Sequence, residues 1–132
     1  MALHQQKFRE IVFQLLFSSQ FDLESQEETA SMLMAELKVT KRSVKDALVK
    51  VSSILEKLGE IDEKLQEASK QYLVDRISTA EKCALRLGIF ELSYEEPALP
   101  RPIVITEAIR ITKKFGTKEG AQFVHAVLDA LQ

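Results

Sequence analysis

The stretch from Thr79 to Ser93, TAEKCALRLGIFELS, constrains the fold more than any other part of the chain. Its apolar residues spread around a helical wheel of 3.6 residues per turn instead of keeping to one face. Four charged residues interrupt them: Glu81, Lys82, Arg86 and Glu91. A helix that is apolar almost all round must be enclosed by other elements. The sequence therefore predicts a buried central helix over residues 79–93.

Two local patterns support this helix. Ser78 and Glu81 have the spacing of a capping box, which marks a helix start. Ala80, Ala84 and Gly88 follow one another at intervals of four residues and form a ridge of small side chains. A neighbouring helix can approach closely along such a ridge. Glycine inside a helix costs about 1 kcal/mol relative to alanine, so we expect Gly88 to serve packing.

Six further segments carry apolar residues at helical spacing or helix-capping residues. They are residues 4–19, 25–37, 40–58, 61–72, 102–115 and 117–131. In the third segment Leu55 is expected to face inward, and Gly59 to end the helix. Tyr72 is expected to face inward in the fourth. The prediction is an all-α protein: a single compact domain of about seven helices around the buried central helix, spanning residues 1–132.

Helix ends are also predicted. Thr40 and Thr117 have N-cap chemistry, and Gly116 suits the position that follows a helix C-terminus. The proline-rich stretch EEPALPRP, residues 95–102, predicts a loop that leads into the sixth helix.

Composition excludes several classes of protein. The chain has 132 residues, 45% of them hydrophobic and 29% charged, as is ordinary for a globular domain. One cysteine, Cys83, suits a reducing cytoplasm and a core position. No apolar run reaches the ~20 residues of a membrane span. We therefore expect a cytoplasmic protein without a membrane partner. The net charge of −2 argues mildly against a general nucleic-acid binder.

Charge is nevertheless segregated along the chain. Residues 21–37 hold five acidic residues and no Lys or Arg, whereas residues 38–58 hold six basic residues and two acidic ones. Residues 60–75 are acidic again, and residues 101–118 hold five basic residues against one acidic. These segments are interpreted either as solvated helix faces or as a localised basic surface that meets phosphate.

Enzymatic signatures are lacking. His4 and His125 fall on different helices, and neither has a Cys, His or carboxylate partner at metal-ligand spacing. No Gly-rich phosphate loop or nucleophile elbow occurs. The acidic residues from Glu60 to Glu63 are interpreted as a solvated helix start. We expect no catalytic activity, no metal and no cofactor.

The chemistry that remains is binding at the junction of the last two helices. Lys113, Lys114 and Lys118 bracket Gly116, and the backbone N–H groups after Thr117 are expected to attract an anion. Lysines contact phosphate, and an aromatic ring such as Phe123 stacks on an unpaired base. For Phe123 the core and binding readings stay open, since Val124, Val127 and Leu128 already define a buried stripe beside it.

Four sequence blocks together resemble the NusB family of bacterial antitermination factors. They are KFREIVFQLLFS from Lys7, AEKCALRLGIFEL from Ala80, PIVITEAIRITKKFG from Pro102 and QFVHAVLDAL from Gln122. The resemblance implies an all-helical protein that binds boxA-type single-stranded RNA together with NusE, a small-subunit ribosomal protein. It implies further that the pair helps RNA polymerase resist termination and supports rRNA transcription.

The resemblance and the basic junction together predict the RNA-binding residues. They are Lys7, Arg9, Lys113, Lys114, Lys118, Glu119 and Phe123. Gln5 and Gln6 stand where the family commonly has arginines, which predicts weaker intrinsic RNA affinity. His125 and Ala126 replace the family's Asn-Gly. The family's central-helix arginine corresponds to Arg86, for which structural and phosphate-facing roles both stay open.

Two alternatives remain beside this reading. One is a helical protein-interaction module with weak or lost RNA binding, in line with the net charge and with Gln5 and Gln6. The other is the similar domain of some RNA cytosine methyltransferases, which the end of the chain at Gln132 disfavours. The sequence leaves open whether the protein forms a homodimer and which surface meets the protein partner.

Overall fold

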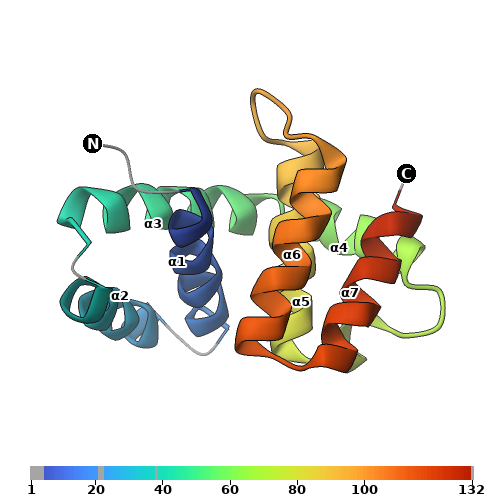
Figure 1. The fold of residues 1–132 in the computed structure, drawn as a ribbon, viewed down its shortest axis with the longest axis horizontal. Helices are drawn as coiled ribbons and strands as arrows, with labels where there is room; N and C mark the ends of the chain where they lie inside the picture. The colour runs from blue at the N-terminus through green and yellow to red at the C-terminus, as the bar shows by residue number, and fades with distance from the viewer. Residues whose placement is uncertain (1–4, 21–22, 38, 132) are drawn as a thin grey trace. The chain divides into compact units, whose positions relative to one another are not determined.

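The computed structural model describes residues 5–20, 23–37 and 39–131, and the side chains of all of these except 23–26 and 37. It confirms the all-α class, with seven α-helices and one short 3₁₀ helix in this described part of the chain (Figure 1). The elements are α1 (Gln5–Ser18), α2 (Leu23–Leu37), α3 (Lys41–Glu56), α4 (Leu58–Ala68), η1 (Val74–Arg76), α5 (Thr79–Ser93), α6 (Arg101–Phe115) and α7 (Lys118–Ala130).

The contacts divide the chain into two compact units, Met1–Leu55 and Glu56–Gln132. In the first unit α1 packs on α2. The ammonium of Lys50 on α3 lies 5.9 Å from the ring centroid of Phe8 on α1, a cation–π contact. The assignment of residues 1–132 to one domain stays a prediction.

The second unit is built around α5. Every residue from Cys83 to Glu91 is buried, and α5 contacts α4, α6 and α7. In Figure 1, α6 lies in front of α5 and beside α7. This confirms the predicted central helix, whose bounds coincide with the expected stretch from Thr79 to Ser93.

The ridge of small residues on α5 also packs as expected. A Cβ placed on Gly88 would lie 3.3 Å from Leu128 of α7 and 3.7 Å from Val104 of α6. A Cβ on Gly116 would lie 3.6 Å from the Cβ of Ala80. Small side chains on α5 therefore let both neighbouring helices approach closely.

Three predicted caps are confirmed. The Thr40 hydroxyl accepts a hydrogen bond from the Ser43 N–H at 3.1 Å. The Ser78 hydroxyl accepts one from the Glu81 N–H at 3.4 Å and donates to the Glu81 carboxylate at 2.7 Å. The Thr117 hydroxyl accepts from the Gly120 N–H at 2.8 Å. Each satisfies a backbone donor that a helix start otherwise leaves unpaired.

The predicted end of the third helix is wrong. α3 ends at Glu56 and α4 begins at Leu58, so that Gly59 lies in the first turn of α4. Leu55 is 37% exposed, whereas Ile54 is fully buried. The buried stripe of α3 follows Val44, Ala47, Val51 and Ile54. Leu55 lies at the edge of this stripe, which the spacing of apolar residues alone did not reveal.

Gly116 confirms the expectation that it follows the C-terminus of the sixth helix. It is the C-cap residue of α6, and its N–H donates to the Thr112 carbonyl at 2.7 Å. Its φ of −128° is negative, however, so it does not adopt the left-handed conformation that favours glycine after a helix. Limited space explains why glycine occupies this position, since a Cβ there would lie 3.0 Å from the Thr112 carbonyl oxygen.

Candidate nucleic-acid interface

The junction of α6 and α7 carries exposed cations, as predicted. Lys113 and Lys114 lie in the last turn of α6, where positive charge also favours the helix dipole. Lys118 is the first residue of α7. All three side chains are exposed. The junction therefore presents three ammonium groups to solvent within six residues of chain.

Contacts with α5 hold this junction in place. A Cβ on Gly120 would lie 2.9 Å from the Glu81 carboxylate, so Gly120 lets the start of α5 approach the first turn of α7. Thr117 caps the Gly120 N–H. The expected anion site at the start of α7 is therefore already partly used: one N–H is capped, and a carboxylate lies beside it. Attraction for phosphate at the junction depends on the lysines.

Phe123 makes an aromatic contact that the sequence did not predict. Its ring meets that of Tyr72 edge to face, with 5.7 Å between centroids and an interplanar angle of 81°. Phe123 is half-buried. Tyr72, expected to face inward on the fourth helix, is 53% exposed. The helical pattern misplaced Tyr72 because α4 ends at Ala68, four residues earlier.

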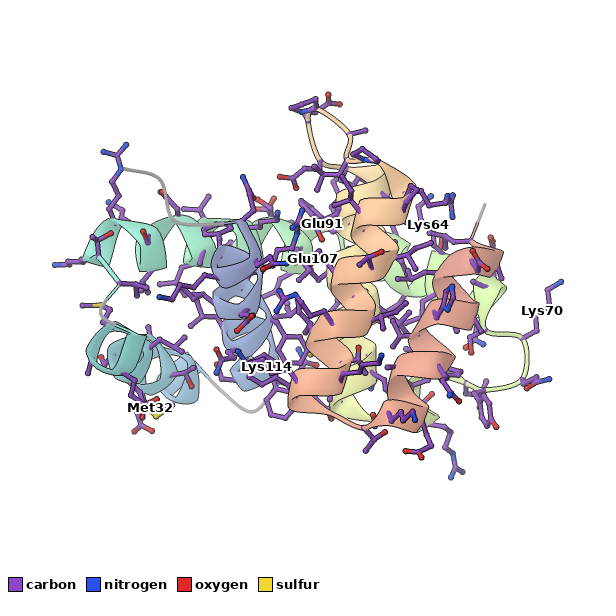
Figure 2. The ribbon with its side chains drawn as sticks, viewed as in Figure 1. Met32, Lys64, Lys70, Glu91, Glu107 and Lys114 are labelled. Atoms are coloured by element: carbon purple, nitrogen blue, oxygen red, sulfur yellow. The ribbon has the colours of Figure 1, made fainter. Side chains whose placement is uncertain are left out.

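The lysines and the aromatic pair make contacts on different elements. The ammonium of Lys114 lies 5.7 Å from the ring centroid of Phe115 on the same helix. In Figure 2, Lys114 and Lys70 project from opposite sides of the α6 and α7 pair. Lys70 precedes Tyr72 by two residues. The Lys114 contact is therefore local to α6, whereas Phe123 of α7 pairs with Tyr72 of the segment that follows α4.

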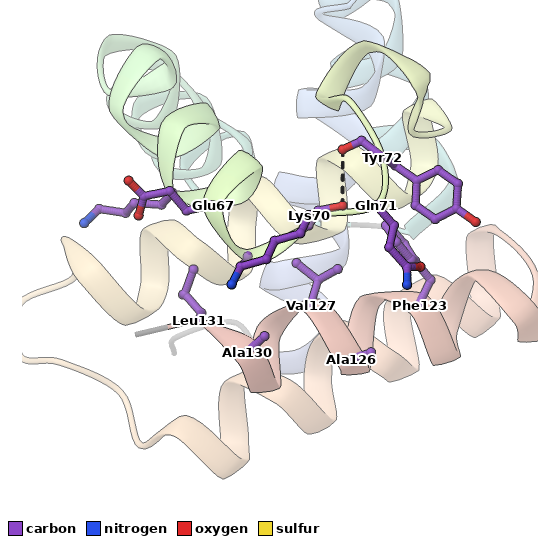
Figure 3. A pocket seen from close by; sticks show the side chains of 12 residues that line it. Glu67, Lys70, Gln71, Tyr72, Phe123, Ala126, Val127, Ala130 and Leu131 are labelled. Atoms are coloured by element: carbon purple, nitrogen blue, oxygen red, sulfur yellow. Dashed lines mark hydrogen bonds between the residues drawn. The ribbon is translucent and has the colours of Figure 1, made fainter.

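A cavity of about 660 Å³ lies next to the aromatic pair. Its walls come from the end of α4, the segment that follows α4, and one side of α7. Figure 3 shows Tyr72 and Phe123 at one end and Glu67 at the other, with Ala126 and Ala130 of α7 between them. Sequence spacing gave no signal for this cavity, since it depends on where α4 stops.

Two further predicted site residues, Lys7 and Arg9, lie in the first unit. Gln5, Gln6 and Lys7 are exposed in the first turn of α1. Arg9 is buried, with 6% of its surface exposed. Lys7 is therefore the exposed cation of the two. Glu119 and His125, on α7 in the second unit, are both exposed. His4 lies outside the described residues.

Arg86 binds a carboxylate inside the second unit. Its Nε lies 2.9 Å from Oδ1 of Asp62 and its Nη2 lies 2.8 Å from Oδ2. The Arg86 side chain is 7% exposed, so this bidentate pair is largely shielded from water. Of the two roles left open for Arg86, the structural one matches these contacts.

Cys83 is fully buried in α5. Burial raises the pKa of its thiol from 9.0 to about 11, while the nearby Arg86 and Lys82 charges act in the opposite direction. A thiol with so high a pKa carries almost no thiolate at neutral pH, which makes it a poor nucleophile.

The described residues form neither a metal-binding cluster nor a membrane-spanning helix. No group of three or more His, Cys, Asp or Glu side chains within residues 5–20, 23–37 and 39–131 is placed to hold a metal ion. Within the same residues, every helix is too short or too polar to cross a membrane.

Comparison with known proteins gives consistent results. The sequence model of the NusB family matches residues 6–132. The transcription antitermination protein NusB of Chlamydia pneumoniae is 37% identical over 125 residues, covering 95% of this chain and 78% of that protein. NusB of Wolinella succinogenes is 34% identical over 124 residues, covering 94% and 90%.

Solved structures share the fold. Superposition on T. maritima NusB gives a TM-score of 0.77 at 29% identity, covering 98% of this chain and 90% of that one. A crystal structure of the antitermination factors NusB and NusE in complex with dsRNA gives 0.78 at 24% identity, covering 96% and 93%. The family match spans nearly the whole chain and the relatives exceed 30% identity along most of it, so the chain belongs to the NusB family.

Proposed function

We propose that this chain is a transcription antitermination factor that binds boxA-type single-stranded RNA together with NusE. In this role it helps the RNA polymerase antitermination complex resist termination and supports rRNA transcription. The relatives that are 37% and 34% identical are named transcription antitermination proteins. The solved complex of NusB and NusE with dsRNA has the same fold as this chain.

The exposed lysines around the α6–α7 junction are the observation that carries the proposal. Lys113, Lys114 and Lys118 face solvent, although the chain as a whole has a net charge of −2. Phosphates neutralised by such lysines release counterions, which supplies sequence-independent affinity. Farther along α7, the half-buried ring of Phe123 offers a stacking surface to an unpaired base.

The start of α1 predicts dependence on the protein partner. Gln5 and Gln6 are exposed but uncharged, and Arg9 is buried. Lys7 is thus the exposed cation among the described residues of that turn. With fewer phosphates neutralised, RNA affinity of the isolated chain should be low, and NusE should supply part of the missing contact.

Electrophoretic mobility shifts test this function. The chain is titrated into labelled boxA RNA and into a scrambled RNA of the same length, with and without NusE, at several salt concentrations. We expect a weak shift for the chain alone, a stronger and sequence-selective shift with NusE, and weaker binding as salt rises. Equal affinity for boxA RNA with and without NusE would contradict the dependence on the partner.

The same turn of α1 favours one alternative, a protein-interaction module that has lost RNA binding. In that case NusE co-elutes with the chain in size-exclusion chromatography, yet neither the chain nor the pair shifts boxA RNA. The two functions therefore differ in an outcome that the same titration reports.

A further inference from the structure

A row of exposed cations lies at the start of α3. Lys41, Arg42 and Lys45 are all exposed, and they form a cluster, the α3 cation patch. At about 100° per residue, their positions fall on the face of α3 opposite to the stripe that this helix buries. The segment that contains them is the most basic part of the first unit, and the proposed function uses none of these cations.

The patch costs local stability. Lys41 and Arg42 lie in the first turn of α3, where positive charge opposes the helix dipole. That turn contains no acidic residue. Lys41 and Lys45 are also four positions apart, a spacing at which like charges on one helix face repel each other. Helix formation therefore does not account for this arrangement, whereas an anionic ligand would relieve the repulsion.

The protein itself leaves these charges unbalanced. The structure gives Lys41, Arg42 and Lys45 no ion pair with any residue that it describes. Asp46 is the acidic residue of the first two turns of α3, and its side chain is exposed as well. The three cations are therefore available to an external anion.

From this arrangement we propose that the α3 cation patch binds the phosphates of RNA outside the boxA element. Four residues of α-helix rise by about 6 Å, so Lys41 and Lys45 are spaced like neighbouring phosphates of an extended strand. Arg42 adds a planar guanidinium, which can bind one phosphate through two hydrogen bonds. Such contacts hold the RNA backbone without reading its bases.

The inference rests on the proposed function and extends it. An RNA that carries boxA brings flanking strand with it, and this strand supplies the phosphates. The patch adds sequence-independent affinity to a chain whose α1 start has Gln5 and Gln6 in place of cations.

Charge and shape favour RNA over a protein or a membrane as the occupant. A stable protein interface buries about 800 Å² per partner around an apolar core. The large apolar side chain that this face of α3 exposes is Val49, which is too small to form such a core. A helix that lies on a membrane inserts an apolar face, whereas the apolar stripe of α3 is buried in the protein. Phosphate binding needs only cations within reach.

Lysine acetylation maps the contact directly. The complex of the chain with NusE is acetylated to a low extent, with and without an RNA that carries boxA and a flanking uridine tract. Mass spectrometry then measures the reactivity of each lysine. We expect this RNA to protect Lys41 and Lys45. Lys57, which is exposed at the N-cap of α4, is the internal control and should react equally in both samples.

Affinity gives a second readout, from a variant that combines Lys41→Gln, Arg42→Gln and Lys45→Gln. At about 0.15 M salt it should bind the RNA with the uridine tract about tenfold more weakly, and boxA RNA without the tract within about twofold of the unchanged chain. The slope of log affinity against log salt for the longer RNA should fall by about two, since each single-strand phosphate contributes about 0.7.

Two controls separate binding from folding. The thermal unfolding temperature of the triple variant should stay the same or rise, because repulsion within α3 is removed. Asp46→Asn removes the negative charge beside the patch and should strengthen binding of the longer RNA. A structural role of the cations predicts neither result.

The remaining outcomes distinguish this inference from the proposed function. If boxA RNA binds but the uridine tract adds no affinity and the triple variant binds both RNAs normally, the proposed function stands and the patch does not bind RNA. If the triple variant loses NusE and keeps its own RNA affinity, the patch docks a protein. If Lys41 and Lys45 are protected without any preference for boxA over scrambled RNA, the patch stands and the proposed function fails. If no RNA binds with or without NusE, both fail.

Discussion

Arg86 of α5 and Asp62 of α4 form a bidentate ion pair, with N–O distances of 2.9 and 2.8 Å, across 24 positions of sequence. The arginine side chain is 7% exposed and the aspartate side chain 29%. Pairs of this geometry combine charge with fixed orientation. The contact joins the central helix α5 to α4, the helix that carries Gln66.

Removing one partner of this pair should destabilise the protein. Asp62→Ala leaves the buried guanidinium without its carboxylate, and we expect the free energy of unfolding to fall by about 2 to 3 kcal/mol. Partial exposure of Asp62 keeps the loss below that of a fully buried pair. Urea denaturation measures it. The double change Arg86→Met with Asp62→Leu should cost less than Asp62→Ala, because it removes both charges of the bidentate pair together. A double variant that is less stable than Asp62→Ala would contradict this.

Charge reversal at the end of α6 should weaken RNA binding without unfolding the protein. Lys113→Glu together with Lys114→Glu changes the net charge by about −4 at the place where phosphate is expected to bind. Both side chains are exposed, so the melting temperature should change by no more than a few degrees. Mobility shifts with boxA RNA and NusE, and thermal unfolding of the same samples, provide the two readouts.

A matched control compares the RNA affinity of two single variants with the same charge change, Lys57→Glu and Lys113→Glu. Lys57 is also exposed, but it lies at the N-cap of α4. Equal losses of RNA affinity in the two variants would show that net charge, and not the α6–α7 junction, governs binding. A large loss of stability in the Lys113 variant would make that lysine structural.

The helical glycines Gly88 and Gly59 should respond in opposite ways to larger side chains. Gly88→Val adds atoms between Leu128 and Val104, where even a Cβ lies 3.3 Å from its neighbour, and should cost about 1 to 3 kcal/mol. At Gly59 an added Cβ meets no atom within 4 Å. Gly59→Ala should therefore stabilise the protein by up to about 1 kcal/mol. Thermal unfolding of both variants checks this, and destabilisation by Gly59→Ala would contradict it.

Stability should fall above pH 9 because of Cys83. The folded pKa of about 11 exceeds the value of 9.0 for an exposed thiol, so the unfolded chain releases this proton first. The stabilisation is complete below pH 9 and is lost as the pH rises through 11. The lost stabilisation amounts to about 3 kcal/mol of unfolding free energy at the high end of this pH range.

The measurement is urea denaturation at pH 7.5 and pH 10.5 for the original chain and for Cys83→Ala. Cys83→Ala has no thiol that can ionise, so its free energy of unfolding should fall less between the two pH values. Parallel pH dependence in both proteins would show that Cys83 does not ionise on unfolding in this window.

Gln66 should control the segment that follows α4. Gln66→Leu removes three hydrogen bonds to main-chain groups while retaining a similar volume. Amide hydrogen exchange at Val74, whose N–H donates to Gln66, should become faster. Gln71→Leu, at an exposed residue of the same segment, serves as the control and should leave exchange at Val74 unchanged. Unchanged exchange in Gln66→Leu would mean that the segment holds its path by other contacts.

Local signals explain which parts of the fold the sequence predicted. The bounds of α5 followed from an apolar pattern around the whole helix and from the cap at Ser78. The junction at Gly116 and Thr117 followed in the same way from residues adjacent in sequence. The interactions that set these boundaries span only three or four positions, so a single sequence is sufficient to recognise them.

The parts that were not predicted depend on residues far apart in sequence. Residues 69–72 read SKQY, without glycine or proline, so nothing local marks the end of α4 before Tyr72. The partner of Arg86 lies on another helix, and Leu55 was assigned inward although Ile54 takes that place. In each case the spacing of apolar residues predicts a helix but not which neighbour covers it.

The contacts of Gln66 have a consequence for how this protein can change. They hold carbonyl and amide groups of the main chain, which every residue except proline supplies in the same form. Lys70, Gln71, Tyr72 and Leu73 can therefore be exchanged while the turn keeps its course. Residues of this segment that line the neighbouring cavity can therefore diverge in sequence without loss of the hydrogen bonds that Gln66 makes.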